Sequence, residues 1–145
     1  MKLLLLLALT VVSGLPQVSG NLAQFSEMIK SKTGKNALTS YGAYGCHCGI
    51  SGQGTPKDDT DWCCARHDCC YKRLVSRKCG TKFLKYDVTI QGSSITCKAN
   101  QSSCQKELCE CDKAAASCFA KHLKSYNKKY QLYPNWMCSG NAPSC

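Results

Sequence analysis

Acidic residues are scarce in this sequence. Its 145 residues include 9 Asp and Glu but 19 Lys and Arg, which gives a formal net charge of +10. The sequence also lacks an apolar run long enough to span a bilayer, an internal repeat and a linker between domains. Neither zinc-finger spacing nor an aromatic ribonucleoprotein motif is present, which argues against a nucleic-acid partner. The basic surface therefore favours acidic lipids or sulfated polysaccharides.

The first twenty residues have the pattern of a signal peptide. Lys2 precedes the apolar run LLLLLALTVV, and the small residues VSG precede Asn21. We therefore expect residues 1–20 to be removed on export. Residues 21–145 are expected to form a single secreted domain with one modest core.

Cysteine, by contrast, is abundant. All 14 cysteines lie after residue 20, and a high, even number in an exported chain predicts up to seven disulfides. Zinc is the rival interpretation for the segments CHC and CCARHDCC. An oxidising compartment removes the thiolates that zinc needs, so we favour the disulfides.

The hydrophobic pattern predicts a mainly α-helical, disulfide-rich fold with one small β-hairpin. An N-terminal helix is expected from Leu22 to near Gly34, followed by a glycine-rich loop over residues 41–56. One long helix is expected over about 60–74, and a second from Ser103 through the segment ending SYNKK. Between them, the segments FLKYDVTI and ITC flank the turn residues QGSS and predict the hairpin.

Cysteines on the two long helices share one spacing. Cys63 and Cys70 are seven residues apart on the first helix, and Cys111 and Cys118 on the second. Seven residues are two turns, a rise of roughly 10.5 Å, so each pair lies along one helix face. Antiparallel helices would then be joined by Cys63–Cys118 and Cys70–Cys111, although spacing alone also allows other pairings.

This register brings a histidine and two carboxylates to one rigid seam. Asp112 is placed within one turn of His67, while Asp68 and Tyr71 share a face with His67. A histidine whose tautomer is fixed by a carboxylate suits a general base near neutral pH. Asp68 has no partner in this register, and a free carboxylate beside a carbonyl-rich loop suits calcium, although no EF-hand pattern is present. The simpler alternative is that His67 and Asp112 form a satisfied buried pair that has no catalytic role.

These residues resemble the motifs of the secreted phospholipases A2, most closely the mammalian group IIA type. CCARHDCC resembles the family's histidine signature, LCECDKAAASC its aspartate signature and YGCHCG its calcium loop, and the resemblance extends over residues 21–145. It implies calcium-dependent hydrolysis of the sn-2 ester of glycerophospholipids at anionic membrane surfaces. It also implies a secreted enzyme, peripheral on membranes, with roles in inflammation, lipid metabolism and antibacterial defence. Heparan sulfate proteoglycans and a cell-surface receptor are further partners that it implies.

The resemblance also assigns the catalytic roles. His67 is expected to draw the proton from water, and Asp112 to orient His67. Tyr71 and Tyr86 are expected to hydrogen-bond Asp112.

The calcium ligands and the acyl-chain channel follow from the same resemblance. Asp68 and the backbone carbonyls of His47, Gly49 and Ser51 are expected to hold the ion, with the Gly49 amide helping to stabilise the oxyanion. Serine at position 51 departs from the family, which usually has glycine there. An apolar channel for acyl chains is expected at three residues of the first helix, for which plain core packing is the alternative: Leu22, Phe25 and Ile29.

Two other classes of function compete with the enzyme. The first is a non-catalytic binding protein on the same scaffold, and the second is a cationic module that disrupts membranes. Neither needs His67, Asp68 and Asp112 together, so the enzyme is favoured. The segment NQS at Asn100 is a glycosylation sequon, and sequons often stay unoccupied.

Overall fold

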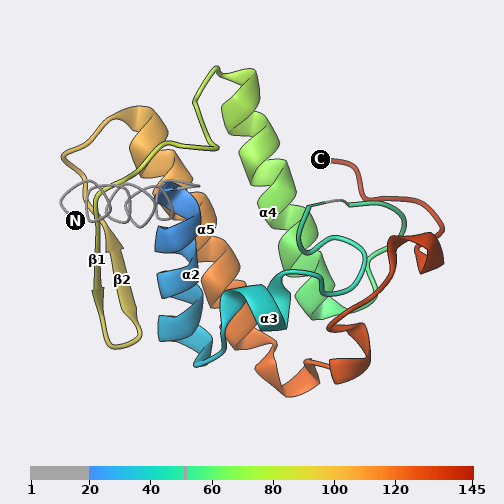
Figure 1. The fold of residues 1–145 in the computed structure, drawn as a ribbon. Coiled ribbons are helices and arrows are strands. Elements are labelled where there is room, and N and C mark those ends of the chain that lie inside the picture. The colour runs from blue at the N-terminus through green and yellow to red at the C-terminus, as the bar shows by residue number, and fades with distance from the viewer. Residues whose placement is uncertain (1–19, 51) are drawn as a thin grey trace, which may run out of the picture.

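Two long antiparallel helices form the centre of the fold. The computed structural model describes residues 20–50 and 52–145, so the signal-peptide prediction, apart from Gly20, and the Ser51 prediction fall outside the described residues. α4 (Asp59–Ser76) and α5 (Ser103–Lys121) lie side by side, and α2 (Gly20–Thr33) packs against α5 (Figure 1). The predicted fold class is confirmed. None of the helices in this described part is long and apolar enough to cross a membrane.

Polar side chains fix where the long helices begin. Asp58 accepts a hydrogen bond from the Asp61 amide at the start of α4. At α5, Ser102 and Gln105 form a capping box, in which each side chain accepts a hydrogen bond from the other residue's backbone amide. The first helical turn leaves these amides without partners inside the helix, so each cap contributes about 1 kcal/mol.

Disulfides join the elements, and every cysteine takes part in one. Cys63–Cys118 and Cys70–Cys111 connect α4 to α5 with Cα–Cα distances of 5.8 and 5.9 Å, which is the ladder expected from the spacing. The other bridges are Cys46–Cys138, Cys48–Cys64, Cys69–Cys145, Cys79–Cys104 and Cys97–Cys109. Because no free thiol remains, the rival zinc interpretation has no thiolate ligand.

The predicted hairpin is present between the long helices. β1 (Val88–Gln91) pairs antiparallel with β2 (Ser94–Cys97), and Ile90 lies opposite Ile95. The buried Ile95 faces the core, and the disulfide from Cys97 ties β2 to α5. β1 begins at Val88, so Tyr86 precedes the strand and its side chain reaches α5.

One boundary prediction is wrong: α5 ends at Lys121 and does not continue to the SYNKK segment. Tyr126 turns back to the core, where its hydroxyl donates to the Ser40 carbonyl at 2.5 Å and its ring meets Tyr41 edge-on. Packing this partly buried ring against the core stabilises the turn that ends the helix. The pattern also missed α3 (Ala37–Tyr41), and the tail contains three 3₁₀ turns at Leu123–Ser125, Lys128–Tyr130 and Asn135–Met137.

Candidate active site

A histidine and a buried aspartate form the centre of the site. Nε2 of His67 lies 2.7 Å from Oδ1 of Asp112, and Asp112 is fully buried. α4 presents the histidine and α5 the aspartate, and the two disulfides between these helices hold their register. His67 and Asp112, which the predicted helix register placed within one turn of each other, are therefore in direct contact.

Two tyrosines occupy the remaining positions around Asp112. Tyr71 donates its hydroxyl hydrogen to Oδ1 and Tyr86 donates to Oδ2, both at 2.6 Å. Burial, followed by the charge of Asp112, raises the pKa of both phenols, so they remain protonated donors. Both oxygens of the buried carboxylate are thus hydrogen-bonded, as a buried polar group requires.

Aromatic rings hold the imidazole in place. Phe25 stacks on His67 with ring centroids 4.5 Å apart, and Tyr71 packs against it at 4.4 Å. The His67 side chain is 13% exposed. Because Nε2 faces a carboxylate acceptor, we assign the ring proton to Nε2, which leaves the lone pair on Nδ1.

The three residues expected to line an acyl channel have different surroundings. Leu22 is 49% exposed at the start of α2, whereas Ile29 is 2% exposed and belongs to the core. Phe25 lies between these extremes and stacks on His67. The position of Ile29 fits core packing equally well, so the channel stays a prediction.

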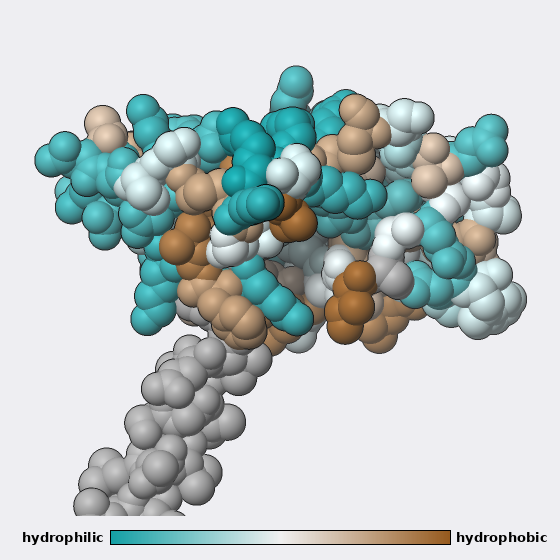
Figure 2. All heavy atoms as spheres, turned by 90° about the horizontal axis from the view of Figure 1, so that it is seen from above, coloured by the Kyte–Doolittle hydropathy of each residue, from teal (hydrophilic) through white to brown (hydrophobic). Residues whose placement is uncertain are grey.

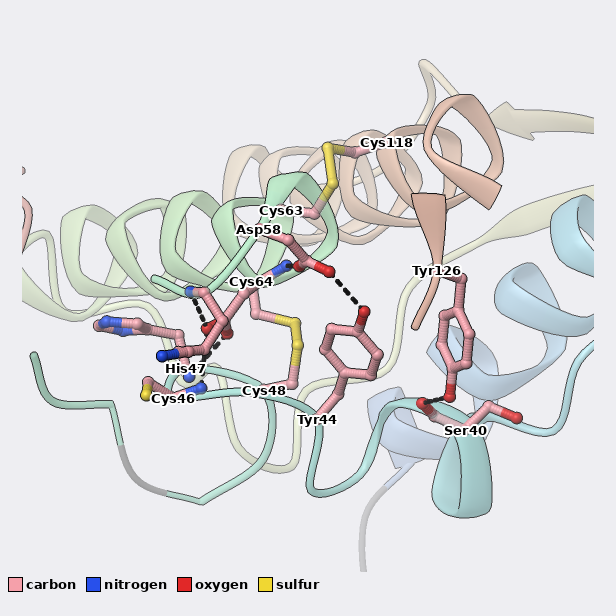
Figure 3. Close-up of a disulfide and its surroundings, with 12 residues drawn as sticks. Ser40, Tyr44, Cys46, His47, Cys48, Asp58, Cys63, Cys64, Cys118 and Tyr126 are labelled. Atoms are coloured by element: carbon pink, nitrogen blue, oxygen red, sulfur yellow. Dashed lines mark hydrogen bonds between the residues drawn. A yellow bond between two sulfur atoms is a disulfide. The ribbon is translucent and has the colours of Figure 1, made fainter. Parts of the chain in front are cut away.

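Asp61, a further buried carboxylate, shapes the glycine-rich loop. It accepts hydrogen bonds from the backbone amides of Cys46, His47 and Lys57 at 2.7, 2.8 and 2.8 Å. Gly45, at φ +60°, lies so close that a Cβ there would come within 2.4 Å of the Asp61 carboxylate. The loop is therefore tied to the first turn of α4, and the Cys48–Cys64 disulfide adds a covalent tie (Figure 3).

Sequence reasoning missed Asp61 because it assigned the DDTD segment to helix capping alone. Asp58 is the residue that caps the helix. The available signal was spacing, since Asp61 lies three residues before Cys64 and so shares the helix face of that buried cysteine.

Asp68 lies where the loop approaches α4. A Cβ at Gly52 would come within 3.3 Å of the Asp68 carboxylate and 2.7 Å of the His47 ring. Within the described residues, the Asp68 carboxylate accepts no hydrogen bond, and burial raises its pKa. The carbonyls of His47 and Gly49 likewise accept none there.

These oxygens suit a hard cation. A partly buried carboxylate without hydrogen-bond donors is destabilised, and calcium prefers carboxylate and backbone carbonyl oxygens. Gly49 has φ +105°, and a Cβ there would lie 2.2 Å from the Gly42 carbonyl, so the loop needs glycine at this position. Ser51, the third expected carbonyl ligand, lies outside the described residues.

Comparison with known proteins assigns this arrangement to a family. The family model described as Phospholipase A2 matches residues 22–131. The chain belongs to the phospholipase A2 family. It is 68% identical, over the full length of both chains, to "Phospholipase A2, membrane associated" of Cavia porcellus, and 61% identical to the protein of that name from Homo sapiens. It is also 50% identical to "Group IIE secretory phospholipase A2" of Mus musculus over 90% of each chain. The group II resemblance is confirmed, and the chain is a phospholipase A2 hydrolase.

The C-terminal tail of this phospholipase A2 braces the glycine-rich loop. The Thr55 amide donates to the Ser139 carbonyl at 2.9 Å, and the Thr55 hydroxyl donates to the Asn141 carbonyl at 3.0 Å. A cleft of about 350 Å³ opens between the loop, α4 and the tail. Its walls include Asp68 and Lys72 of α4, His47 and Ile50 of the loop, and Ala142, Pro143 and Cys145 of the tail.

Proposed function

We propose that this phospholipase A2 hydrolyses the sn-2 ester of glycerophospholipids at anionic membrane surfaces in a calcium-dependent reaction, releasing a fatty acid and a lysophospholipid. The observation that carries the proposal is the convergence of a histidine hydrogen-bonded to one carboxylate with a second carboxylate that has no hydrogen-bond donor among the residues that the structure describes. The His67–Asp112 contact is 2.7 Å, and Asp68 follows His67 directly on α4.

His67 acts as the general base. Nε2 is engaged by Asp112, so Nδ1 is the atom that accepts a proton from water as the water attacks the ester. The imidazolium formed in this step lies 2.7 Å from the Asp112 carboxylate, which stabilises its charge. The ring later returns the proton to the leaving alcohol. No serine or cysteine nucleophile takes part.

Asp112 is a positioning residue that acts through His67. Tyr71 and Tyr86 fix the orientation of its carboxylate, and the carboxylate fixes the ring. The stacked Phe25 restricts rotation of the imidazole. Little ordering is therefore left to occur when substrate binds, which lowers the entropic part of the barrier.

Asp68 and the carbonyls of His47, Gly49 and Ser51 would hold the calcium ion. When bound, the ion supplies positive charge that polarises the ester carbonyl and stabilises the oxyanion. Asp61 holds the His47 amide and so positions the adjoining part of the loop. The Gly49 amide donates a hydrogen bond to the oxyanion.

Charge and apolar side chains together support docking to an anionic bilayer. The formal net charge is +10, and lysines such as Lys72 and Lys129 are exposed. Ile50 lies fully exposed at the cleft and Leu22 is 49% exposed on α2. In the view of Figure 2, hydrophobic residues gather around a hollow while hydrophilic residues cover much of the surrounding surface. A surface of this kind combines electrostatic attraction with burial of apolar area in the interface.

The remaining parts of the proposal concern location and partners. The seven disulfides support an oxidising, extracellular compartment. The basic surface suits sulfated chains such as heparan sulfate. A cell-surface receptor, and roles in inflammation, lipid metabolism and antibacterial defence, complete what the group II resemblance implies.

The decisive experiment titrates the acid released from phosphatidylglycerol and phosphatidylcholine vesicles, with calcium or with excess chelator. We expect hydrolysis only with calcium, faster on the anionic vesicles and slower as salt is added. Asp68→Lys should abolish it. Asp87→Lys is the matched control, since it makes the same charge change at an exposed residue whose hydrogen bonds, within the part of the chain that the structure describes, use only its backbone atoms. Hydrolysis that persists in chelator would contradict the calcium mechanism, and equal rates on both vesicles would contradict anionic docking.

A further inference from the structure

One segment carries a chemical pattern that the hydrolase does not use. Asn100, Gln101 and Ser102 form the single Asn-x-Ser/Thr sequence in the chain, and they lie between β2 and α5. We propose that the Asn100 side chain is the acceptor of an N-linked oligosaccharide. The proposal rests on the proposed export, because the donor of this sugar is found only in the secretory pathway.

The three residues of the sequon have separate tasks in the folded protein. The Gln101 side chain is fully engaged, since it accepts from the Asp87 amide at 2.8 Å and donates to the carbonyls of Asp87 and Lys98. Ser102 caps α5. Asn100 is exposed, and its side chain makes no hydrogen bond within the described residues. Its neighbours fix the turn, so a glycan on Asn100 would displace no native contact.

The turn also has room for a large substituent. Lys98, Ala99 and Asn100 are all exposed. In Figure 1 this turn lies on the opposite side of the helices from the glycine-rich loop and the C-terminal tail. Along α5, Ser103 precedes Asp112 by nine residues, a rise of roughly 14 Å at about 1.5 Å per residue. A glycan here would leave the cleft at Asp68 open.

The chemistry is a transfer from a lipid-pyrophosphate-linked oligosaccharide. A bond forms between Nδ2 of Asn100 and the anomeric carbon of the first sugar. The bond from that carbon to the pyrophosphate oxygen breaks, and the lipid pyrophosphate leaves with the electron pair. The amide nitrogen loses one proton, and no oxidation or reduction takes place.

The disulfides set when this transfer can occur. The Cys97–Cys109 bridge closes a loop that contains the whole sequon, and Cys104 beside it is bridged to Cys79. In the folded protein the Ser102 hydroxyl oxygen accepts the Gln105 amide in the α5 cap, so the transferring enzyme would have to compete with this contact. We therefore place the modification before closure of Cys97–Cys109. Delaying disulfide formation in the cell should raise the fraction of chains that carry the glycan.

The test expresses the full chain in mammalian secretory cells and measures the intact mass before and after peptide-N-glycosidase treatment. We expect a loss of mass for wild type, and conversion of Asn100 to Asp in the released peptide. Asn100→Gln should abolish the shift and Ser102→Thr should keep it. Asn141→Gln is the control, because Asn141 is exposed but lies outside a sequon. A secreted wild-type chain whose Asn100 peptide is wholly unmodified overturns the proposal while leaving export and catalysis intact.

Two further measurements test the position of the glycan relative to the active site and the order of glycosylation and disulfide closure. Hydrolysis of a micellar substrate by the glycosidase-treated enzyme should match that of the untreated enzyme, because the turn is remote from His67. A change of several-fold would overturn the remote placement of the glycan. A mild reductant during expression should increase occupancy of Asn100, and unchanged occupancy would overturn the order of events.

Discussion

Asp112 shows how much of this enzyme depends on one residue. It is fully buried and accepts hydrogen bonds from His67, Tyr71 and Tyr86. Each of these donors needs a carboxylate oxygen, and an amide would replace one of the two oxygens by a donor. The geometry therefore depends on a carboxyl group in the interior, both of whose oxygens accept hydrogen bonds from protein donors.

Asp112→Asn should lower kcat by about 10²- to 10⁴-fold, because the imidazole loses the acceptor that fixes its tautomer. Calcium affinity should change little, since Asp112 is not among the proposed ligands. Initial rates at saturating calcium and a calcium titration measure both quantities. Asp87→Asn serves as the control at an exposed site. A rate within a few-fold of wild type would show that Asp112 has only a structural role.

Asp68 makes the calcium-free protein sensitive to pH. Burial raises its pKa from 3.8, so the folded state binds this proton more tightly than the unfolded chain does. The contribution of Asp68 to the free energy of unfolding without calcium therefore falls as pH rises from about 3.8 through the raised pKa.

Asp68→Asn should consequently stabilise the chelated protein at pH 7, because it removes the buried charge. The gain should vanish below the ordinary carboxyl pKa, where Asp68 is neutral in both states. Denaturant midpoints in chelator at the two pH values provide the measurement. A gain that is independent of pH would mean that charge is not its cause.

The C-terminal tail and the glycine-rich loop are linked into one structural unit. The loop is bonded to α4 by Asp61 and Cys48–Cys64, and to the tail by Cys46–Cys138 and the Thr55 hydrogen bonds. Cys69–Cys145 fixes the end of the tail beside Asp68. The proposed calcium ligands are thus held from two sides.

Removing Cys69–Cys145 by the double change to Ser should weaken calcium binding several-fold, because the loop loses one of its supports. The rate at saturating calcium should stay nearly unchanged, since the bound geometry is the same. Calcium titration of activity separates these two effects. The matched control is the double change at Cys79–Cys104, a bridge that joins the segment after α4 to α5, which should lower stability without changing calcium affinity. Equal losses of calcium affinity in both variants would refute a specific brace.

Parts of the fold that follow from periodicity were predictable from the sequence. The seven-residue cysteine spacing led to the ladder, and the ladder led to the contact between His67 and Asp112. The end of α5 was not predictable, because Tyr126 leaves the helix for a tertiary contact with Ser40. Asp61 was missed because its partners are backbone amides, which have no signature in the sequence, so that only its spacing from Cys64 indicated burial.

The whole molecule relies on covalent links more than on its modest core. Native disulfides in small secreted domains contribute about 2–5 kcal/mol each. Calcium binding stabilises the folded state by an amount that grows only with the logarithm of the calcium concentration. We therefore expect excess chelator to lower the thermal midpoint by a few degrees, while a thiol reductant unfolds the protein. Far-UV circular dichroism under each condition distinguishes the two effects, and unfolding by chelator alone would contradict this account.

The tail bridges also determine what a protease can remove. Lys129 is exposed in a 3₁₀ turn and is the last basic residue of the chain, so residues 130–145 contain no further trypsin site. A cut after Lys129 would leave this segment attached through Cys46–Cys138 and Cys69–Cys145. The nicked enzyme would migrate as one band without reductant and release a short peptide only when its disulfides are reduced.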